Sequence, residues 1–487
     1  MSEIRVRIAP SPSGFLHIGT ARAALFNWLF ARKNNGKFLV RIEDTDTERS
    51  SQEMVTNIFD SLSWMGLESD EPPLYQSQRM RIYNQYVNRL LESGKAYRCW
   101  CTPEELKEMQ EEVRRTKVNS RYDRRCYNLP EAEKKRRIES GAPAAVRLFI
   151  PDGSTTFHDL IVGDVTRNND EIDDFIIARS DGRATYNLAV VVDDHEMRIS
   201  HVIRGNDHIA NTFKQIHIYR ALGIEPPIFA HLPLILGPDR SKMSKRHGAT
   251  AVTDYAKMGY LKDAVVNFIA LLGWSPGDDR EIMTVEEMIE AFSLDRINPT
   301  NAIFDIGKLK WMNGEYIRKT DDNKLVDLIR PFLVEKGLTT NLWINSRWQW
   351  MLKFVGLMRE RCVLLSDFAV SGAYFFTDEF AYDSKGVEKY FSEETVANYL
   401  GKWVNSLREI QDFSALKLEQ VLRDLSEELG IKPVVLIHPT RLALSGVTGG
   451  PPLFEMMELL GGDECVKRLG KAISFILKKL TKKLDNF

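Results

Sequence analysis

The chain of 487 residues is too long for one hydrophobic core, and its length predicts about three to five domains. Hydrophobic residues make up 43% and charged residues 28%, as in an ordinary soluble globular protein, and the net charge of −2 requires that any nucleic-acid surface come from local clusters of basic residues. No apolar run is long enough to span a bilayer, and five cysteines do not make a disulfide framework, so we expect a protein of the reducing cytoplasm with no membrane partner.

The first predicted elements are a strand, a tight turn and a helix. The β-rich run Ile4–Ile8 is followed by the breaker-rich turn Pro10–Gly14, and an apolar helical pattern opens at His17. A helix start after such a turn presents backbone N–H groups and the positive end of the helix dipole to an anion. Gly19 would let a phosphate approach the backbone, and His17 could donate a hydrogen bond to it. A plain connection between a strand and a helix is the commoner explanation of such a stretch.

Strand and helical patterns alternate as far as about Lys95, which predicts a parallel sheet with helices on both faces. The strands are Ile4–Ile8 and Phe38–Ile42, and the helices are Ala21–Arg32, Glu53–Trp64 and Arg79–Glu92. Glu43 follows the second strand, at the edge where ligands bind in such sheets. Arg7 lies within the first strand. If both faces of the sheet are covered, its guanidinium needs an anionic partner, such as a carboxylate bound bidentately; on a solvent face it would need none.

Three cysteines, Cys99, Cys101 and Cys126, gather in the region that follows. Cys-x-Cys with a distant third cysteine indicates zinc, but a complete quartet of cysteines and histidines is missing, and reduced structural cysteines are the alternative. The same region, from Lys107 to Arg137, is basic with interleaved acids. A surface for RNA phosphates and an ion-paired exposed helix would both explain this charge pattern.

The sheet is expected to resume with the apolar run Leu188–Val192 as a buried strand. Val202–Gly205 and Phe229–Leu236 are further strand patterns, with a helical pattern at Ile209–Leu222 between them. The polar group that begins at Asp193-Asp194-His195 could be interpreted as a metal site, but we favour structural polar groups because neighbours along a strand point in different directions.

The second half of the chain opens with a basic loop and then becomes helical. The loop is Lys242-Met243-Ser244-Lys245-Arg246, which by itself is most simply a solvated basic loop. Helical patterns follow at Asn323–Lys336, Trp348–Leu365, Glu393–Ile410, Lys417–Leu429 and Glu464–Leu480. The tryptophan cluster of Trp343, Trp348 and Trp350 fits a helical core better than a platform for stacking bases.

Together, the helix start HIGT and the late KMSK loop form a joint signature, and the chain resembles the class I aminoacyl-tRNA synthetases, in particular the glutamyl-tRNA synthetases of bacterial type. The resemblance is carried by RIAPSPSGFLHIGTAR (7–22), VRIEDTD (40–46), YNLAVVVDDH (186–195), VIRGNDH (202–208), KMSKRHG (242–248) and FDIGKLKWMNGEYI (304–317). It covers nearly the whole chain, densely as far as about Arg318 and more sparsely beyond.

This resemblance implies an α/β fold: a Rossmann-type HIGH/KMSK nucleotide-binding catalytic domain, an inserted α+β acceptor-binding domain and an all-helical C-terminal anticodon-binding half. The implied segments are 1–96 and 182–240 for the two catalytic halves, 97–181 for the acceptor-stem insertion, 241–318 for the KMSK loop and stem-contact domain, and 319–487 for the helical anticodon-binding domains.

The implied activity is that of a monomeric glutamate–tRNA ligase. ATP with Mg²⁺ would convert L-glutamate to glutamyl-adenylate once tRNA is bound, and the glutamyl group would pass to the 3′-terminal adenosine of tRNA(Glu). The implied glutamate-binding residues are Arg7, Ser11, Glu43, Tyr186, Asn187 and Arg204. The implied ATP-binding residues are His17, Gly19, Thr20, Lys242 and Lys245, of which all but Gly19 would be catalytic. Arg361 and Arg441 would read the anticodon, and Cys99, Cys101, Tyr122 and Cys126 would hold a structural Zn²⁺.

Two other classes of protein compete with this interpretation. A small adenylyltransferase with a HIGH-type nucleotide fold would lack both the late KMSK loop and the helical half. A noncatalytic tRNA-binding paralogue would have lost His17, Lys245, Arg7 or Glu43, and all four are present. The sequence leaves open whether tRNA(Gln) is also charged, although Arg361 favours discrimination between the two tRNAs.

Overall fold

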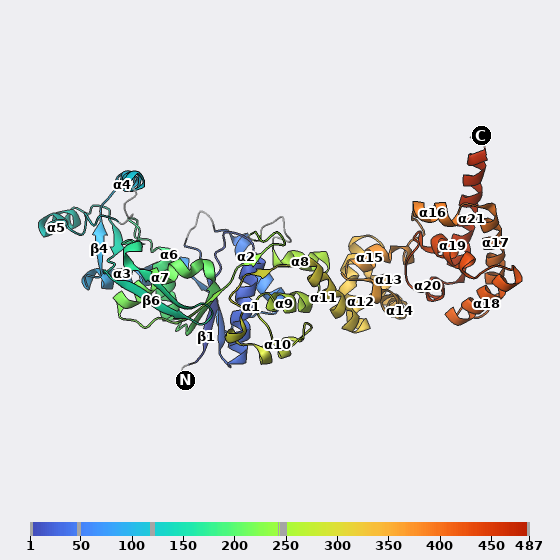
Figure 1. Cartoon of the computed structure of the whole chain (residues 1–487), viewed down its shortest axis with the longest axis horizontal. Helices are drawn as coiled ribbons and strands as arrows, with labels where there is room; N and C mark the ends of the chain where they lie inside the picture. The colour runs from blue at the N-terminus through green and yellow to red at the C-terminus, as the bar shows by residue number, and fades with distance from the viewer. Residues whose placement is uncertain (1–2, 46–49, 117–121, 242, 244–250, 485–487) are drawn as a thin grey trace. The chain divides into compact units, whose positions relative to one another are not determined.

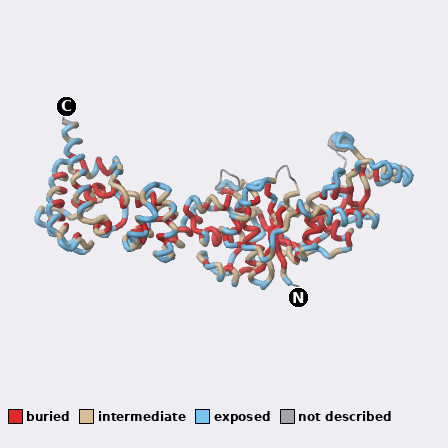
Figure 2. Tube along the Cα trace, turned by 180° about the vertical axis from the view of Figure 1, so that it is seen from behind, coloured by how far each residue is buried: buried red, intermediate tan, exposed pale blue. Residues whose placement is uncertain are grey.

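The computed structural model describes residues 3–45, 50–116, 122–241, 243 and 251–484. The chain divides into two compact units, one formed by residues 1–255 and 265–306 and the other by residues 256–264 and 307–487. Figure 1 shows the elements in chain order, and Figure 2 shows which parts of the trace are buried, intermediate and exposed.

The first unit contains every strand that the structure describes. They are β1 (Arg5–Ile8), β2 (Lys37–Ile42), β3 (Leu74–Tyr75), β4 (Ala96–Cys99), β5 (Ala145–Leu148), β6 (Ser154–Asp159), β7 (Gly163–Asn168), β8 (Ile176–Ala178), β9 (His201–Gly205), β10 (Ile228–Leu232), β11 (Ile235–Leu236) and β12 (Ala302–Ile303). Its helices are α1 (Ile18–Lys33), α2 (Gln52–Met65), α3 (Met80–Glu92), α4 (Pro103–Thr116), α5 (Glu131–Glu139), α6 (Tyr186–Glu196), α7 (Ile209–Leu222) and α10 (Val285–Ala291). Helices α8 (Val252–Met258), α9 (Lys262–Ala270) and α11 (Ile306–Lys319) contain residues of both units.

Parallel strands form the centre of this unit, as predicted. β1, β2 and β3 pair in that order, all parallel, with Arg7 opposite Leu39. A second sheet has the order β7-β6-β10-β9, in which β10 runs parallel to both β6 and β9, and β6 and β7 form an antiparallel hairpin. The carbonyl of Arg5 in β1 accepts a hydrogen bond from the N–H of Ser200, which directly precedes β9, at 2.9 Å. A separate antiparallel sheet has the order β4-β5-β8, and β6 and β7 of the second sheet lie between its strands β5 and β8 along the chain.

Local sequence explains where the helices of this unit begin and end. The Ser51 hydroxyl caps α2 by accepting a hydrogen bond from the N–H of Met54. The helix ends at Gly66, whose φ of +76° is a left-handed conformation that glycine adopts without a steric penalty. Gly223 ends α7 in the same way, with φ +67°. These stops follow the apolar patterns closely, and the predicted helices at 53–64, 79–92 and 209–222 are confirmed.

The apolar run Leu188–Val192 is a helix, so the prediction of a strand there was wrong. It lies within α6, in which every residue from Leu188 to Asp194 is buried. A short apolar run without polar alternation fits a fully buried helix and a buried strand equally well. The predicted strand Phe229–Leu236 is divided into β10 and β11, because Pro233 cannot donate to a strand ladder.

The second unit is helical, and every regular element that the structure describes after Arg318 is a helix. Its helices are α12 (Asp322–Glu335), α13 (Asn341–Ser346), α14 (Trp348–Met358), α15 (Asp367–Ser371), α16 (Ser384–Tyr390), α17 (Glu394–Glu409), α18 (Ala415–Glu428), α19 (Val434–Ser445), α20 (Leu453–Leu460) and α21 (Gly462–Leu484). Trp343 and Trp350 pack against its core with ring centroids 5.3 Å apart, which confirms their predicted structural role. Among the described residues, no helix has both the length and the apolar character needed to cross a membrane.

Candidate active site

The start of α1 is capped by the side chain of His17. Its Nδ1 accepts hydrogen bonds from the N–H groups of Gly19 and Thr20, at 3.1 and 3.4 Å, so a neutral ring carries its proton on Nε2. That Nε2 is 3.2 Å from the Thr20 hydroxyl. The arrangement differs from the expected one, because two of the helix N–H groups already have an acceptor. An anion at this helix start would meet the imidazole Nε2–H and the Thr20 hydroxyl instead.

The two predicted lysines of the KMSK loop, Lys242 and Lys245, lie outside the described residues. The turn that leads to them is described. The N–H of Ser241 donates to the Asp239 carboxylate at 3.0 Å, and Arg240 has a φ of +60°.

A buried ionic network joins the ends of β1 and β2 to α6. The guanidinium of Arg7 donates from Nε and Nη2 to the two carboxylate oxygens of Asp194, at 2.9 and 3.1 Å. Arg41, which is completely buried, donates to the same carboxylate at 2.6 Å and to Glu43 at 3.3 Å. The predicted anionic partner of Arg7 therefore exists inside the protein. The two guanidiniums lower the pKa of Asp194 to about 2 despite its burial, whereas burial raises the pKa of Glu43 above its usual range.

The neighbouring carboxylate of α6, Asp193, also lies 4.0 Å from Arg41 Nε, but its hydrogen bonds come from other side chains. It accepts hydrogen bonds from the side chains of Gln76, Arg79 and Tyr83, at 2.7 to 2.8 Å, and is fully buried. Sequence reasoning did not find Arg41, Asp193 or Asp194 as partners in an ionic network. One signal was present, since Arg41 interrupts the apolar strand β2 in the way that Arg7 interrupts β1.

Arg204 in β9 lies beside this network and is also buried. Its guanidinium donates to the Thr212 hydroxyl and to the side-chain carbonyl of Gln215, both at 2.7 Å, and to His231 Nε2 at 3.3 Å. All three acceptors are neutral, and no carboxylate among the described residues forms an ion pair with Arg204. Burial lowers the pKa of this arginine.

The structure brings four of the six predicted glutamate-binding residues into one electrostatic environment. The charges of Arg7, Glu43 and Arg204 all act on the hydroxyl of Tyr186, whose pKa burial raises to about 12, so that it remains a hydrogen-bond donor at neutral pH. Asn187 is connected to Arg204 through a shared partner, because its side-chain carbonyl accepts a hydrogen bond from the amide of Gln215. Ser11 is exposed in the turn after β1.

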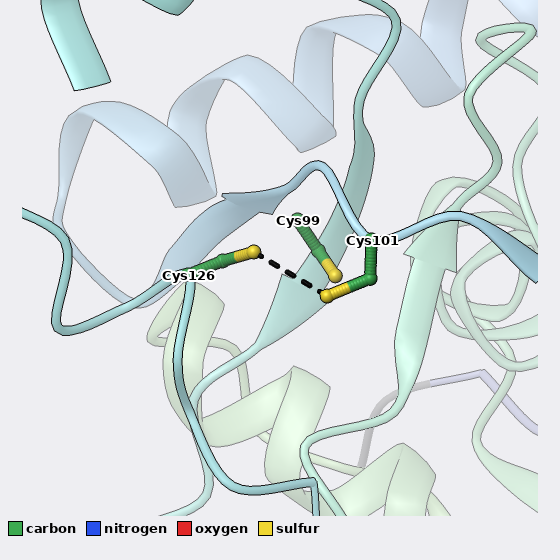
Figure 3. Close-up of side chains that lie close together, drawn as sticks. All are labelled: Cys99, Cys101 and Cys126. Atoms are coloured by element: carbon green, nitrogen blue, oxygen red, sulfur yellow. Dashed lines mark hydrogen bonds between the residues drawn. The ribbon is translucent and has the colours of Figure 1, made fainter. Parts of the chain in front are cut away.

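The three cysteines converge as the metal prediction requires (Figure 3). Their sulfur atoms lie within 4.8 Å of one another, and Cys101 and Cys126 are 3.6 Å apart. A tetrahedral zinc site with sulfur ligands would separate two sulfurs by about 3.8 Å. The hydroxyl of Tyr122 is 3.4 Å from Cys99 Sγ and 3.3 Å from Cys101 Sγ, so it faces the same point as the thiols. The guanidinium of Arg147 lies 4.0 Å from the centre of the Tyr122 ring, where it can offset negative charge on these ligands.

In the helical unit, the two predicted anticodon-reading arginines lie near the same side chain. Arg361 and Arg441 both act electrostatically on the hydroxyl of Tyr374, and burial, with a smaller contribution from the charge of Arg361, lowers the pKa of Arg441. Arg361 is exposed, and Arg441 is half-buried and donates to the carbonyl of Pro451 at 2.6 Å. A Cβ atom added at Gly450 would lie 3.3 Å from the Arg441 guanidinium, so the glycine loop closes over this arginine.

Comparison with known proteins identifies two regions. Residues 3–311 match the family described as tRNA synthetases class I (E and Q), catalytic domain, and residues 324–473 match an anticodon binding domain. The chain is 48% identical to glutamate–tRNA ligase 1 of Caldanaerobacter subterraneus over 477 residues, which cover 98% of each chain. It is also 48% identical to glutamate–tRNA ligase 2 of Thermoanaerobacter pseudethanolicus over 479 residues, which cover 98% of this chain and 99% of that one.

A solved structure is similar over the same extent. The crystal structure of a glutamate tRNA ligase from Elizabethkingia meningosepticum in complex with its amino acid superposes with a TM-score of 0.90 at 33% identity, covering 97% of this chain and 99% of that one. The Rossmann-type fold with a helical C-terminal half is therefore confirmed. The chain belongs to the class I tRNA synthetases for glutamate and glutamine, the family that includes these glutamate–tRNA ligases.

Proposed function

We propose that this protein is a glutamate–tRNA ligase that activates L-glutamate with ATP and transfers it to the 3′-terminal adenosine of tRNA(Glu). The observation that carries the proposal is the charge balance of the buried ionic network and the neighbouring Arg204. Four guanidiniums, those of Arg7, Arg41, Arg79 and Arg204, lie with three carboxylates, those of Glu43, Asp193 and Asp194, which leaves an excess of one positive charge. A bound glutamate, with one net negative charge, complements this excess, and a glutamine side chain would leave a guanidinium facing a neutral amide.

We assign a role in glutamate binding to each of the residues gathered here. Arg204, whose partners are neutral acceptors, binds a substrate carboxylate. Arg7, held at Asp194, faces the second carboxylate together with the exposed Ser11. Glu43 accepts the substrate ammonium group, and the protonated hydroxyl of Tyr186 and the amide of Asn187 supply hydrogen bonds at the border of the pocket.

Activation requires positioning and charge stabilisation rather than an acid or base. A substrate carboxylate oxygen forms a bond to the α-phosphorus of ATP while the bond to the bridging oxygen breaks, and pyrophosphate leaves with Mg²⁺. The Nε2–H of His17 and the hydroxyl of Thr20 donate to the phosphates at the start of α1, where Gly19 leaves space for them. Lys242 and Lys245 are proposed to supply positive charge where negative charge develops on the leaving pyrophosphate. In our proposal this step requires bound tRNA.

The remaining parts of the chain support binding of tRNA. Arg361 and Arg441, which share Tyr374 as a neighbour, are proposed to bind the edges of anticodon bases. The region from 97 to 181 is proposed to bind the acceptor stem. Cys99, Cys101, Cys126 and Tyr122 would hold a structural zinc ion, which when bound would cross-link β4 to the loop after α4. We further propose that the protein acts as a monomer in the cytoplasm.

Aminoacylation of purified tRNA(Glu) and tRNA(Gln) with labelled glutamate, ATP and Mg²⁺ tests the proposal. Charging of tRNA(Glu) alone is expected, and it would support discrimination through Arg361. Charging of both tRNAs would keep the activity but remove that discrimination. Charging of neither would refute the proposed function. A parallel assay of ATP–pyrophosphate exchange should give a signal only when tRNA is present.

A further inference from the structure

A histidine and an aspartate, neither of which the sequence analysis named as a site residue, form a hydrogen bond inside the four-stranded sheet. Asp159 is the last residue of β6, and His231 lies in the neighbouring parallel strand β10. His231 Nδ1 and Asp159 Oδ2 are 2.6 Å apart, and neither side chain has any exposed surface. Buried charged and titratable groups are retained at a cost, so a pair of this kind calls for a role.

The contacts of Asp159 fix which nitrogen of His231 carries the proton. Its Oδ1 accepts hydrogen bonds from three backbone N–H groups, those of Ile161, Val162 and His231, at 3.0, 3.0 and 3.2 Å. Its Oδ2 therefore faces Nδ1, which must donate to it. Burial lowers the pKa of His231, so the ring is neutral and its Nε2 presents a lone pair.

That lone pair points to the arginine of the proposed glutamate pocket. His231 Nε2 accepts from Arg204 Nε at 3.3 Å and is 3.0 Å from the hydroxyl of Thr212. The Thr212 hydroxyl in turn accepts from Arg204 Nη2 at 2.7 Å, as does the side-chain carbonyl of Gln215. Acceptors on two sides of the guanidinium thus fix its plane, and Asp159 controls one of them from a different strand.

We propose that Asp159 and His231 are positioning residues that hold the guanidinium of Arg204 in the orientation in which it binds a carboxylate of glutamate. This inference rests on the proposed function, in which Arg204 contacts that carboxylate. The hydrogen-bond series runs from the β6–β7 hairpin through β10 to β9, and it makes the acceptor geometry around Arg204 depend on the carboxylate at the end of β6. The hydrogens of Nε and Nη2 are used by these three acceptors, so Nη1 is the nitrogen left to donate to the carboxylate, and its direction depends on the plane of the guanidinium.

The substitution Asp159→Asn tests the inference sharply because the three backbone N–H groups dictate how an amide would sit. The carbonyl oxygen of the asparagine must face them, so its NH₂ group points to Nδ1 of His231 and converts the ring to the Nε2–H form. An N–H would then face the N–H of Arg204. We expect the KM for glutamate to rise about 10- to 100-fold while the KM for ATP stays within about twofold of the wild-type value.

A matched control separates this effect from general loss of stability. Asp174 is also a buried carboxylate, and it accepts hydrogen bonds from Tyr97, Arg124 and the backbone N–H of Ile150, none of which contacts Arg204. Asp174→Asn is expected to lower the melting temperature without changing the KM for glutamate. If Asp159→Asn behaves like this control, or raises the KM for ATP as much as that for glutamate, the positioning role is refuted.

A second pair of variants decides the question if Asp159→Asn does not fold. His231→Gln keeps an acceptor oxygen that can face Arg204 and an amide that can donate to Asp159, and it should leave the KM for glutamate within a few-fold of wild type. His231→Phe keeps the ring shape beside Phe229 but removes the acceptor, and it should reproduce the increase of about 10- to 100-fold. Equal KM values for these two variants would overturn the inference. A wild-type protein that charges no tRNA would instead refute the proposed function, and the positioning role with it.

Discussion

Replacement of Asp194 by asparagine should destabilise the first unit and identify the ionic network as its electrostatic centre. Asp194 is 3% exposed and accepts three hydrogen bonds from the guanidiniums of Arg7 and Arg41, at 2.6 to 3.1 Å. Its pKa falls from an ordinary value of 3.8 to about 2, which corresponds to about 2 kcal/mol of stability at neutral pH. The asparagine variant also leaves two guanidiniums with less compensating charge, so we expect a total loss of about 3–5 kcal/mol.

The pH dependence of this loss follows from the sign of the pKa shift. Because the folded protein holds the pKa of Asp194 below that of the unfolded chain, the carboxylate contributes its full stability above about pH 4 and loses it as the pH falls through about 2. The difference in stability between wild type and Asp194→Asn should therefore be greatest at neutral pH. It should shrink as the pH approaches 2.

Hydrogen exchange is the appropriate assay, because a chain of two compact units need not unfold in a single transition. Amides of β1, β2 and α6 should exchange with an opening free energy lowered by the expected amount, while those of the helical unit should not change. Asp164→Asn provides the matched control, since this carboxylate is exposed and its one ion pair with a described residue is to His158, and its loss should cost at most about 0.5 kcal/mol. Equal exchange in both variants would refute the reasoning.

Four further outcomes are expected. Arg7→Ala should raise the KM for glutamate at least about tenfold, because it removes a charge-assisted contact, and unchanged glutamate affinity would show that the pocket is wrongly assigned. Protein prepared without chelators should contain about one zinc per chain, and Tyr122→Phe should weaken its retention against a chelator about tenfold; less than about half a zinc in the wild type would exclude the site. Arg361→Ala should lower the ratio of kcat/KM for tRNA(Glu) to kcat/KM for an anticodon variant, by a factor that corresponds to about 1–3 kcal/mol. An unchanged ratio would rule out base reading by this residue. Gly259→Ala, at φ +96° with its Cβ 2.6 Å from a backbone nitrogen, should lower the unfolding free energy by about 2 kcal/mol or more, whereas Gly337→Ala, at φ +67° in open space, should cost about 1 kcal/mol; similar costs in urea denaturation would contradict the role of that contact.

The sequence predicted most helices and the strands of the first half because their signals are local. Apolar residues at helical spacing and terminal glycines locate α2, α3 and α7 within about two residues, since cap chemistry acts over a single turn. The run Leu188–Val192 was wrongly predicted because total burial erases the alternation that distinguishes a helix from a strand.

For the site too, local features could be predicted from the sequence, whereas contacts between residues far apart along the chain could not. The need of Arg7 for a buried anion could be argued from its place in a covered strand, but its partner Asp194 is 187 residues away along the chain, and nothing local connects the two. The pair of Asp159 and His231 is separated by 72 residues and carries no motif at all. Histidine is not a preferred N-cap residue, so the residue type of His17 gave no indication of the cap. Its position directly before the helix was the better signal.

The strand order β7-β6-β10-β9 also limits how this protein could be recombined. Residues 97–181 could be taken for an independent domain to be exchanged with that of a relative. The exchange would, however, replace β6 and β7, which are two of the four strands of the sheet that also contains β10 and β9. The guest segment would have to match the side chains of β10 in the host, and its aspartate at the end of β6 would have to meet the host's histidine. A chimaera whose exchanged segment ends before β6 takes Asp159 and His231 from the same parent. It should be better tolerated than one in which the whole segment 97–181 is exchanged.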